Sequence, residues 1–129
     1  MIIDDDPFNV IGMQVQLSRV GIKGLGSLCD RAYNGLEAVT KLKDAFNNRN
    51  HIYGLIITDI SMPVMDGYEA AEVIRDFYES NLVPQPLIIA CTGHVEEEFI
   101  KKAWTKRIDE ILPKPVNIEI LKEIINEII

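Results

Sequence analysis

The sequence lacks any apolar run long enough to cross a bilayer, and its apolar stretches, such as 86–91 and the interrupted 124–129, are short. A membrane-spanning helix needs about 20 predominantly apolar residues, so we expect no membrane contact. We also expect no signal peptide, because residues 1–3 run directly into three aspartates. The two cysteines, Cys29 and Cys91, lack metal-ligand spacing and are expected to be reduced thiols. Together these features predict a cytoplasmic location.

Positive charge is also scarce, since 13 Lys and Arg residues face 20 Asp and Glu residues, for a formal net charge of −7. Binding to a nucleic-acid backbone needs a basic surface, so we expect no nucleic-acid partner. The content of apolar residues, 47%, and of charged residues, 26%, is ordinary for a globular protein. A length of 129 residues without repeats or linkers predicts a single domain over 1–129.

Short apolar runs alternate with longer amphipathic segments along the chain. The expected strands are 1–3, 22–32, 53–58, 87–91 and 108–112. The expected helices are 7–20, 36–46, 67–78, 96–106 and 118–129. Five β-then-α units predict an α/β fold in which helices cover both faces of a parallel sheet.

Acidic residues follow two of these strands, Asp4 and Asp5 after the first and Asp59 after the run at 55–58. Ligands of open parallel sheets bind outside the carboxyl ends of the strands. Converging carboxylates repel one another, which implies a bound cation, and Mg²⁺ prefers oxygen ligands. We therefore predict a magnesium site at Asp4, Asp5 and Asp59, with Asp6 as a helix N-cap. The alternative is that the acidic run only caps a helix, since acids favour helix N-termini.

Two further strand ends carry groups that suit a phosphoryl ligand. The hydroxyl of Thr92 could hydrogen-bond a phosphoryl oxygen, and the ammonium of Lys114 could offset its charge. Taken alone, each residue could be structural. Pro113 and Pro115 fix the backbone on either side of Lys114, and the Lys114–Pro115 bond could be cis. Considered together with the acids, these residues predict that Asp59 is a phosphoryl acceptor.

The chain resembles a receiver domain, the phosphoaccepting module of two-component response regulators and hybrid histidine kinases, over essentially all of its length. The matching segments are 3–6 (IDDD), 32–38 (AYNGLEA), 58–67 (TDISMPVMDG), 91–93 (CTG) and 114–115 (KP). The segment 59–67 is the most specific of them. The resemblance implies a flavodoxin-like, doubly wound (βα)5 fold with a five-stranded parallel sheet in the order 2-1-3-4-5.

The resemblance also implies a reaction. Asp59 would take a phosphoryl group from a phosphohistidine in a histidine kinase or a histidine phosphotransfer protein. Asp5, Asp59 and the backbone carbonyl of Ser61 would bind Mg²⁺ directly, and Asp4 would act mainly through water. Thr92 and Lys114 would bind the phosphoryl oxygens.

A signalling switch follows from these roles. Movement of Thr92 after phosphorylation would shift the surface formed by 96–106, 108–112 and 118–129. The isolated domain would catalyse its own phosphorylation and dephosphorylation without being an enzyme for other substrates. Homodimer formation is left open.

The chain departs from the family pattern at two places. The family often has Tyr or Phe three residues before the lysine, where this chain has Ile111, which questions gating by an aromatic ring. Only three residues precede Asp4, fewer than family members usually have. We therefore expect either a stand-alone regulator or a piece of a longer protein such as a hybrid kinase.

Two other functions compete with this one. An aspartate-dependent phosphatase of the haloacid dehalogenase type needs an Asp-x-Asp motif after its first strand, and Asp4 and Asp6 meet that bare pattern. A degenerate receiver would serve only for protein contacts. Degeneracy is argued against by the retention of all four key residues, Asp5, Asp59, Thr92 and Lys114.

Two apolar stripes run along the predicted helix 7–20, at about 100° per residue. The stripe expected to face the core contains Val10, Met13, Leu17 and Val20. The stripe on nearly the opposite side contains Phe8, Ile11 and Val15. We expect this second stripe to be exposed and to dock the partner, with Ile120, Ile124 and Ile128 of 118–129 as a rival surface. Trp104, with Phe99 and Ile100, is expected to pack in the core.

Overall fold

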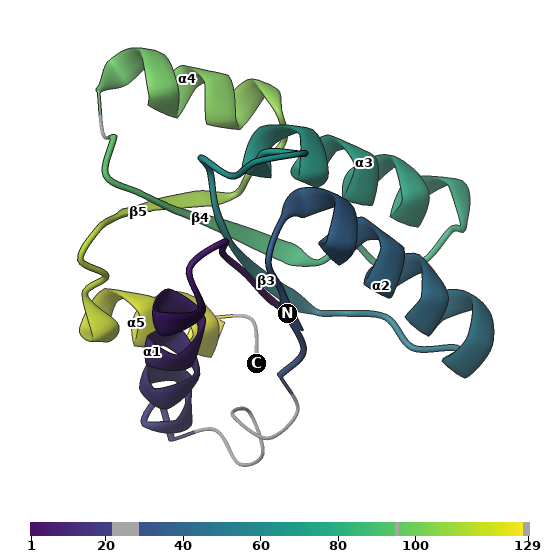
Figure 1. Ribbon diagram of the computed structural model, residues 1–129, viewed down its shortest axis with the longest axis horizontal. Coiled ribbons are helices and arrows are strands. Elements are labelled where there is room, and N and C mark those ends of the chain that lie inside the picture. Colours follow the sequence, from purple (N-terminus) through teal and green to yellow (C-terminus); the bar gives the residue numbers. More distant parts are fainter. Residues whose placement is uncertain (22–28, 95, 128–129) are drawn as a thin grey trace.

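The sheet of this protein has five parallel strands in the order β2-β1-β3-β4-β5. The structure is a computed structural model that describes residues 1–21, 29–94 and 96–127. The strands are β1 (Ile2–Ile3), β2 (Arg31–Ala32), β3 (Leu55–Asp59), β4 (Leu87–Thr92) and β5 (Glu110–Pro113). The helices are α1 (Pro7–Ser18), α2 (Gly35–Arg49), α3 (Gly67–Ser80), α4 (Glu97–Thr105) and α5 (Ile118–Glu127). The predicted fold class and strand order are confirmed (Figure 1).

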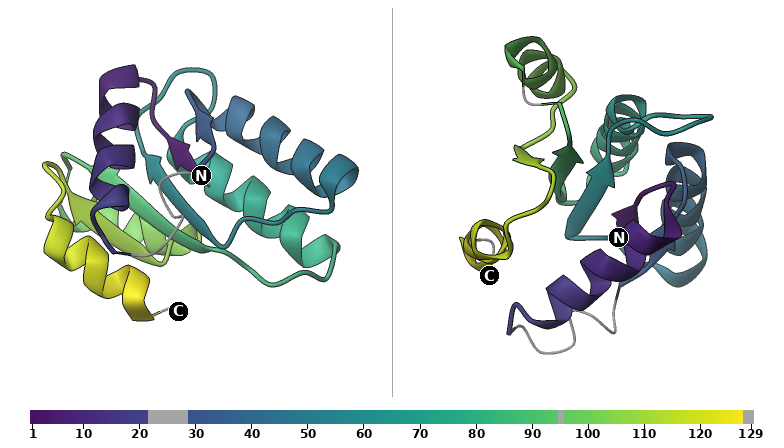
Figure 2. Two further views of the ribbon diagram at one scale, coloured as in Figure 1. Left: turned by 90° about the horizontal axis from the view of Figure 1, so that it is seen from below. Right: turned by 60° about the vertical axis from the view of Figure 1, so that its left-hand side comes forward.

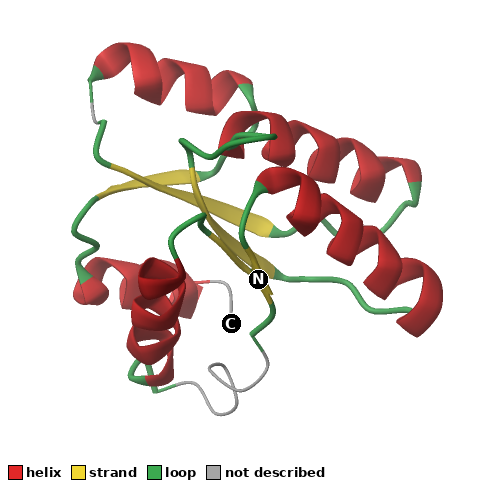
Figure 3. Cartoon of the chain, in the orientation of Figure 1, coloured by secondary structure: helices red, strands yellow, loops and turns green. Residues whose placement is uncertain are grey.

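Helices cover both faces of the sheet, as Figures 2 and 3 show. Side chains alternate between the two faces along each strand. Ile56 and Ile88 therefore pack toward α2 and α3 in one core, and Ile57 and Ile89 pack toward α1 and α5 in the other. Burial on both faces explains why the central strands are continuous apolar runs, and it gives the strand ends a rigid base.

The two stripes of α1 lie as predicted. Val10, Leu17 and Val20 are buried, and Met13 is half-buried against the same core. The opposite stripe is exposed, with 84% of Phe8, 51% of Ile11 and 44% of Val15 accessible.

The prediction for Trp104 was wrong, because this side chain is 65% exposed. Ala103, its neighbour, is the residue of α4 that is buried against the sheet. Successive residues of a helix point about 100° apart, so Trp104 is turned toward solvent. Phe99 and Ile100 are half-buried.

Several element boundaries differ from those predicted. Helix α2 continues to Arg49, because Asn50 adopts the left-handed conformation (φ 50°) and ends it. Helix α1 ends at Ser18, two residues early. Of the predicted strand 22–32, the described part forms a strand only at Arg31–Ala32, and 22–28 lie outside the described residues. The Lys114–Pro115 peptide bond is cis. Within the described ranges, no helix has the length and apolar character needed to cross a membrane.

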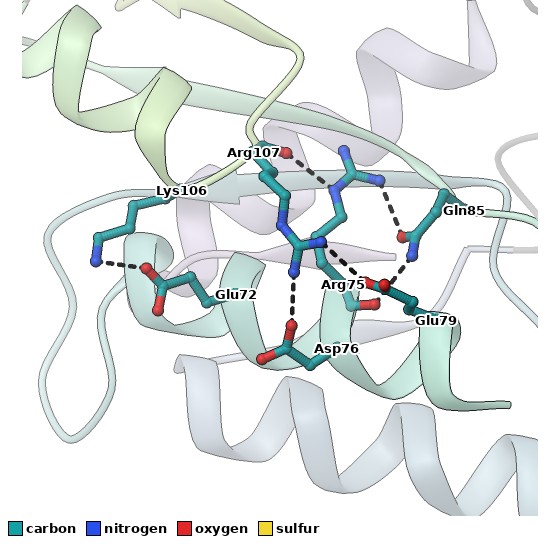
Figure 4. Close-up of polar contacts among 7 residues, drawn as sticks. All are labelled: Glu72, Arg75, Asp76, Glu79, Gln85, Lys106 and Arg107. Carbon is teal, nitrogen blue, oxygen red and sulfur yellow. Dashed lines mark hydrogen bonds and ion pairs between the residues drawn. The ribbon is translucent and has the colours of Figure 1, made fainter.

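A buried arginine joins α3 to the segments that lead into β4 and β5 (Figure 4). Arg75 is only 5% exposed. Its guanidinium donates to the carbonyl oxygens of Pro86 at 2.7 Å and Arg107 at 2.9 Å, and to the Asp109 carboxylate at 2.7 Å. Gln85 lies 3.2 Å from the same group. These bonds satisfy a buried charge and fix the start of β5.

Arg75→Leu should lower the free energy of unfolding by about 2–4 kcal/mol, because it removes the donor to the buried carbonyl of Pro86 and breaks the bonds to Arg107 and Asp109. Arg107→Leu is the matched control, since its guanidinium pairs with exposed carboxylates and should change stability by less than about 1 kcal/mol. Urea denaturation measures both variants. Equal losses would contradict the special role of the buried arginine.

Candidate functional site

The pairing of the strands brings the predicted site residues to one edge of the sheet. Ile3 of β1 lies beside Thr58 of β3, so the next residues, Asp4 and Asp59, are neighbours. Thr92, which ends β4, lies beside Pro113 of β5. The carboxyl ends of β1, β3, β4 and β5 therefore meet, as predicted.

Asp4 is buried, at 7% exposure, and is held by the start of α1. Its Oδ1 accepts the backbone N–H of Asp6 at 2.9 Å and the side-chain amide of Asn9 at 3.4 Å. Asp6 is the N-cap of α1 and accepts the N–H of Phe8 at 2.9 Å, as predicted. The turn at the start of α1 thus places Asp4 in the candidate site and Asp6 at the N-cap of the helix.

Asp59 is positioned by a close approach of α3. Its Oδ1 accepts the N–H of Ile60 at 2.9 Å, and the N–H of Gly67 donates to the Ile60 carbonyl at 2.8 Å. A Cβ atom at position 67 would lie 2.2 Å from the backbone carbonyl oxygen of Asp59. Only glycine allows the N-terminus of α3 to pack so close to this acid.

Lys114 connects two of the acids. Its Nζ lies 3.2 Å from Oδ1 of Asp59 and 3.5 Å from Oδ2 of Asp4. Its backbone N–H donates to the carbonyl of Thr92 at 2.9 Å, which ties the residue after β5 to the end of β4. The predicted placement of Lys114 at the acids is confirmed.

Burial and the ammonium of Lys114 have opposite effects on Asp59 at this edge, and the effect of burial is the larger of the two. Burial raises the pKa of Asp59 above its usual value, although the hydrogen bond and charge of Lys114 act to lower it. For Lys114, burial acts to lower the pKa, but the hydrogen bond to Asp59 and the charges of Asp59 and Asp4 raise it overall. Lys114 is attracted by two carboxylates, whereas Asp59 shares this ammonium with Asp4. The charged form of Lys114 therefore gains more from the contacts than the charged form of Asp59 does. The site can therefore accept further positive charge.

The three acids suit a small divalent cation. One carboxylate oxygen from each of Asp4, Asp5 and Asp59 lies within 4.8 Å of the others. Asp5 is exposed and Asp59 is half-buried, so water can complete the coordination. Mg²⁺ prefers such hard oxygen donors and keeps several waters, and the residues fit it. Ser61 lies exposed just beyond β3, and its carbonyl as a further ligand remains a prediction.

Thr92 is buried at the same edge, with 6% of its surface exposed. Its hydroxyl oxygen accepts the backbone N–H of His94 at 3.0 Å. No acceptor for the hydroxyl hydrogen lies among the described residues, so this group can donate to a ligand oxygen. This arrangement fits the predicted binding of a phosphoryl oxygen, which itself remains a prediction.

Two contributions to the site were not anticipated. Asn9 supports Asp4 from the first turn of α1, and an amide three residues after an N-cap is the signal that could have suggested it. Cys91 adjoins Thr92, and burial raises the pKa of its thiol to about 12. The thiol is therefore neutral at neutral pH and is a poor nucleophile.

Comparison with known proteins gives a consistent result. The family model for the response regulator receiver domain matches residues 1–126. Hybrid signal transduction histidine kinase G of Dictyostelium discoideum is 36% identical over 126 residues, covering 98% of this chain and 3% of that protein. The peroxide stress-activated histidine kinase mak1 of Schizosaccharomyces pombe is 28% identical over 129 residues, covering 100% of this chain and 7% of that protein. The chain thus spans less than a tenth of these relatives.

Solved structures share the fold. A chain from the Saccharomyces cerevisiae complex of the histidine phosphotransfer signaling protein Ypd1 with the receiver domain of Ssk1 matches with a TM-score of 0.79 and 28% identity. That match covers 98% of this chain and 84% of the other. A chain from the CheX–CheY–BeF3–Mg²⁺ complex of Borrelia burgdorferi matches with a TM-score of 0.78 and 25% identity, covering 99% and 87%.

Asp59→Asn should leave the free energy of unfolding at pH 7 in metal-free buffer unchanged or higher. Because the native pKa of Asp59 is raised, its charged form is less favourable in the folded than in the unfolded protein. The gain should therefore disappear below pH about 4, where the residue is protonated in both states. Urea denaturation at both pH values measures it. Asp66→Asn, which keeps an N-cap of equal quality, is the control, and a clear loss of stability at position 59 contradicts this account of the site.

Mg²⁺ should stabilise the protein in proportion to its binding, and Asp5→Ala should remove that stabilisation. The reason is that Asp5 is the exposed carboxylate of the cluster, open to a hydrated cation. Thermal unfolding across a Mg²⁺ titration measures the effect. Asp6→Ala is the matched control, since it should cost about 1 kcal/mol of helix capping and leave the response to Mg²⁺ intact. If the two variants behave the other way round, the assigned ligand is wrong.

Proposed function

Because the chain belongs to the response regulator receiver domain family, we propose that it is a phosphoacceptor switch whose acceptor is Asp59. The observation that carries this proposal is the contact of Asp59 with Lys114 inside the carboxylate cluster, 3.2 Å from Nζ to Oδ1. The donor is a phosphohistidine of a histidine kinase or histidine phosphotransfer protein. A fold neighbour solved together with the phosphotransfer protein Ypd1 supports that class of partner.

The transfer needs little covalent chemistry from the protein. A carboxylate oxygen of Asp59 attacks the phosphorus, a P–O bond forms, and the P–N bond to the imidazole breaks. Catalysis is then mostly positioning and charge neutralisation. The raised pKa of Lys114 keeps its ammonium protonated at neutral pH, so it can hold a phosphoryl oxygen. Bound Mg²⁺, held by Asp4, Asp5 and Asp59, would offset further negative charge on the phosphoryl group.

Phosphorylation would then change the partners of Thr92. Its hydroxyl now accepts the N–H of His94, and a phosphoryl group on Asp59 offers it an acceptor at the same edge. Movement of Thr92 biases the surface formed by α4, β5 and α5 between two arrangements. The small share of its relatives that this chain spans is compatible with a parent hybrid histidine kinase.

The phosphatase alternative is disfavoured by the first helix. That function needs Asp4 and Asp6 as its Asp-x-Asp motif, whereas Asp6 here is exposed and accepts the N–H of Phe8 as the N-cap of α1. A receiver without phosphorylation is disfavoured by the intact set of Asp5, Asp59, Thr92 and Lys114 at one edge.

Acetyl phosphate with Mg²⁺ should add one labile phosphoryl group to Asp59, because the site provides a nucleophile and compensating charge. Intact mass spectrometry and peptide mapping measure the adduct. Asp59→Asn should show none, and the unmodified chain with a chelator should show far less. Turnover of added phosphoesters would support the phosphatase, and an inert chain would support a pure interaction module.

We further propose that the exposed stripe of α1 docks the helical bundle that carries the donor histidine. Phe8, Ile11 and Val15 are exposed on the helix that begins beside Asp4 and Asp5. An apolar surface next to the acceptor both excludes water and orients an incoming donor. The rival surface on α5 offers Ile120, 43% exposed, whereas Ile128 lies outside the described residues.

Ile11→Glu should slow phosphoryl transfer from a histidine phosphotransfer protein by tenfold or more, at roughly 1.4 kcal/mol per factor of ten. Labelling by acetyl phosphate should remain normal, because the small donor needs no docking surface. Ile120→Glu makes the same change on α5 and is the matched control. If Ile120→Glu alone slows the protein donor, the docking surface lies on α5.

A further inference from the structure

Helix α4 is fixed to α3 at its C-terminal end by a row of ion pairs (Figure 4). The acids of α3 that form this row are Glu72, Asp76 and Glu79. Lys106 pairs with the first, and Arg107 pairs with the other two at 2.6 and 3.2 Å. The buried Arg75 also donates to the carbonyl of Arg107 at 2.9 Å. Each exposed pair is weak alone, but together with the buried bond they define the position of this end.

The N-terminal end of α4 is held much more loosely. The N-cap, Glu96, makes no side-chain capping bond. Phe99 stacks on the ring of His94 with centroids 4.8 Å apart, and the hydroxyl of Tyr68 donates to the Phe99 carbonyl at 3.3 Å. Among the described residues, no ion pair joins the first half of the helix to another element. Lys102, near the middle, lies over the ring of Tyr68.

Among the described residues, His94 connects this end of α4 to Thr92 at the edge of the sheet. The hydroxyl of Thr92 accepts the N–H of His94 at 3.0 Å, and the ring of His94 lies on Phe99. Ile111 lines the same space between α3, α4 and β5. Its aliphatic side chain has no flat ring that could rotate into the space left by Thr92 when that side chain moves. Within the described part of this loop, the His94–Phe99 pair thus links Thr92 to α4.

We propose that phosphorylation of Asp59 tilts α4 about its C-terminal end, and that His94 and Phe99 transmit the movement of Thr92 to the helix. This inference rests on the proposed function and specifies its regulation. A helix of nine residues is about 13 Å long, so a tilt of roughly 10° moves its free end by about 2 Å, a shift typical of such switches. The anchored end, near Thr105, moves little.

Spin-label distances before and after treatment with acetyl phosphate and Mg²⁺ test the tilt. One label pair joins Asn47→Cys on α2 to Glu98→Cys at the free end, and a second joins Asn47→Cys to Thr105→Cys. All three positions are exposed, and Cys29→Ser with the buried Cys91 prevents unwanted labelling. The first distance should shift by about 2 Å and the second by less than about 1 Å.

Three variants separate transmission from anchoring. Phe99→Leu keeps an apolar side chain but removes the ring stack, so the shift at position 98 should be lost while Asp59 is still phosphorylated. Trp104→Leu makes the same kind of change on the exposed side of α4, about 140° around the helix, and should keep the shift. Lys106→Gln with Arg107→Gln should allow the label at Thr105 to move as well.

The outcomes distinguish this inference from the function on which it rests. If mass spectrometry finds no adduct on Asp59, the proposed function fails and the tilt fails with it. If the adduct forms but both labels shift equally, or neither shifts, the pivot is wrong. A shift at position 98 that survives Phe99→Leu overturns the transmission through the ring pair.

Discussion

Three carboxylates meet at the carboxyl edge of the sheet, and a single ammonium lies between two of them. Repulsion among these charges is stronger than in water, because Asp4 and Asp59 are largely withdrawn from solvent. The fold tolerates this cost because Asp4 and Asp59 are each fixed by a backbone N–H that does not depend on the other acid. The remaining negative charge makes the edge receptive to a cation.

The rigidity of this edge comes from burial far from it. Strands β3 and β4 are covered on both faces, so their ends cannot shift without disturbing two cores. The close packing of Gly67 against the carbonyl of Asp59 adds a steric constraint from α3. The groups that would respond to a ligand lie on the other side of the site. Among the described residues, the side chain of Thr92 bonds to the N–H of His94 in its own loop, and that loop leads to the less constrained end of α4.

Much of this could be predicted from local patterns. Buried strands appear as short apolar runs, and a reactive residue directly after such a run must lie at the sheet edge, as Asp59 does. Periodicity also separated the two sides of α1 correctly. It failed for Trp104, because an amphipathic pattern does not say which of two neighbours faces the core. The smaller Ala103 fits against the sheet, and the large indole is left outside. Helix ends were similarly uncertain, since α2 stops only where Asn50 turns left-handed.

The sequence by itself determined the class of fold, the acids at the strand ends and the receiver family, because these depend on residue type and on short-range order along the chain. Tertiary structure alone decided which of these groups touch. Asp59 and Lys114 are far apart in sequence, and only the parallel pairing of β3, β4 and β5 brings them to 3.2 Å. The same holds for the ion pairs between α3 and the end of α4. Such contacts join segments whose local patterns are independent of each other, so they exist only once the sheet has set the distance between those segments.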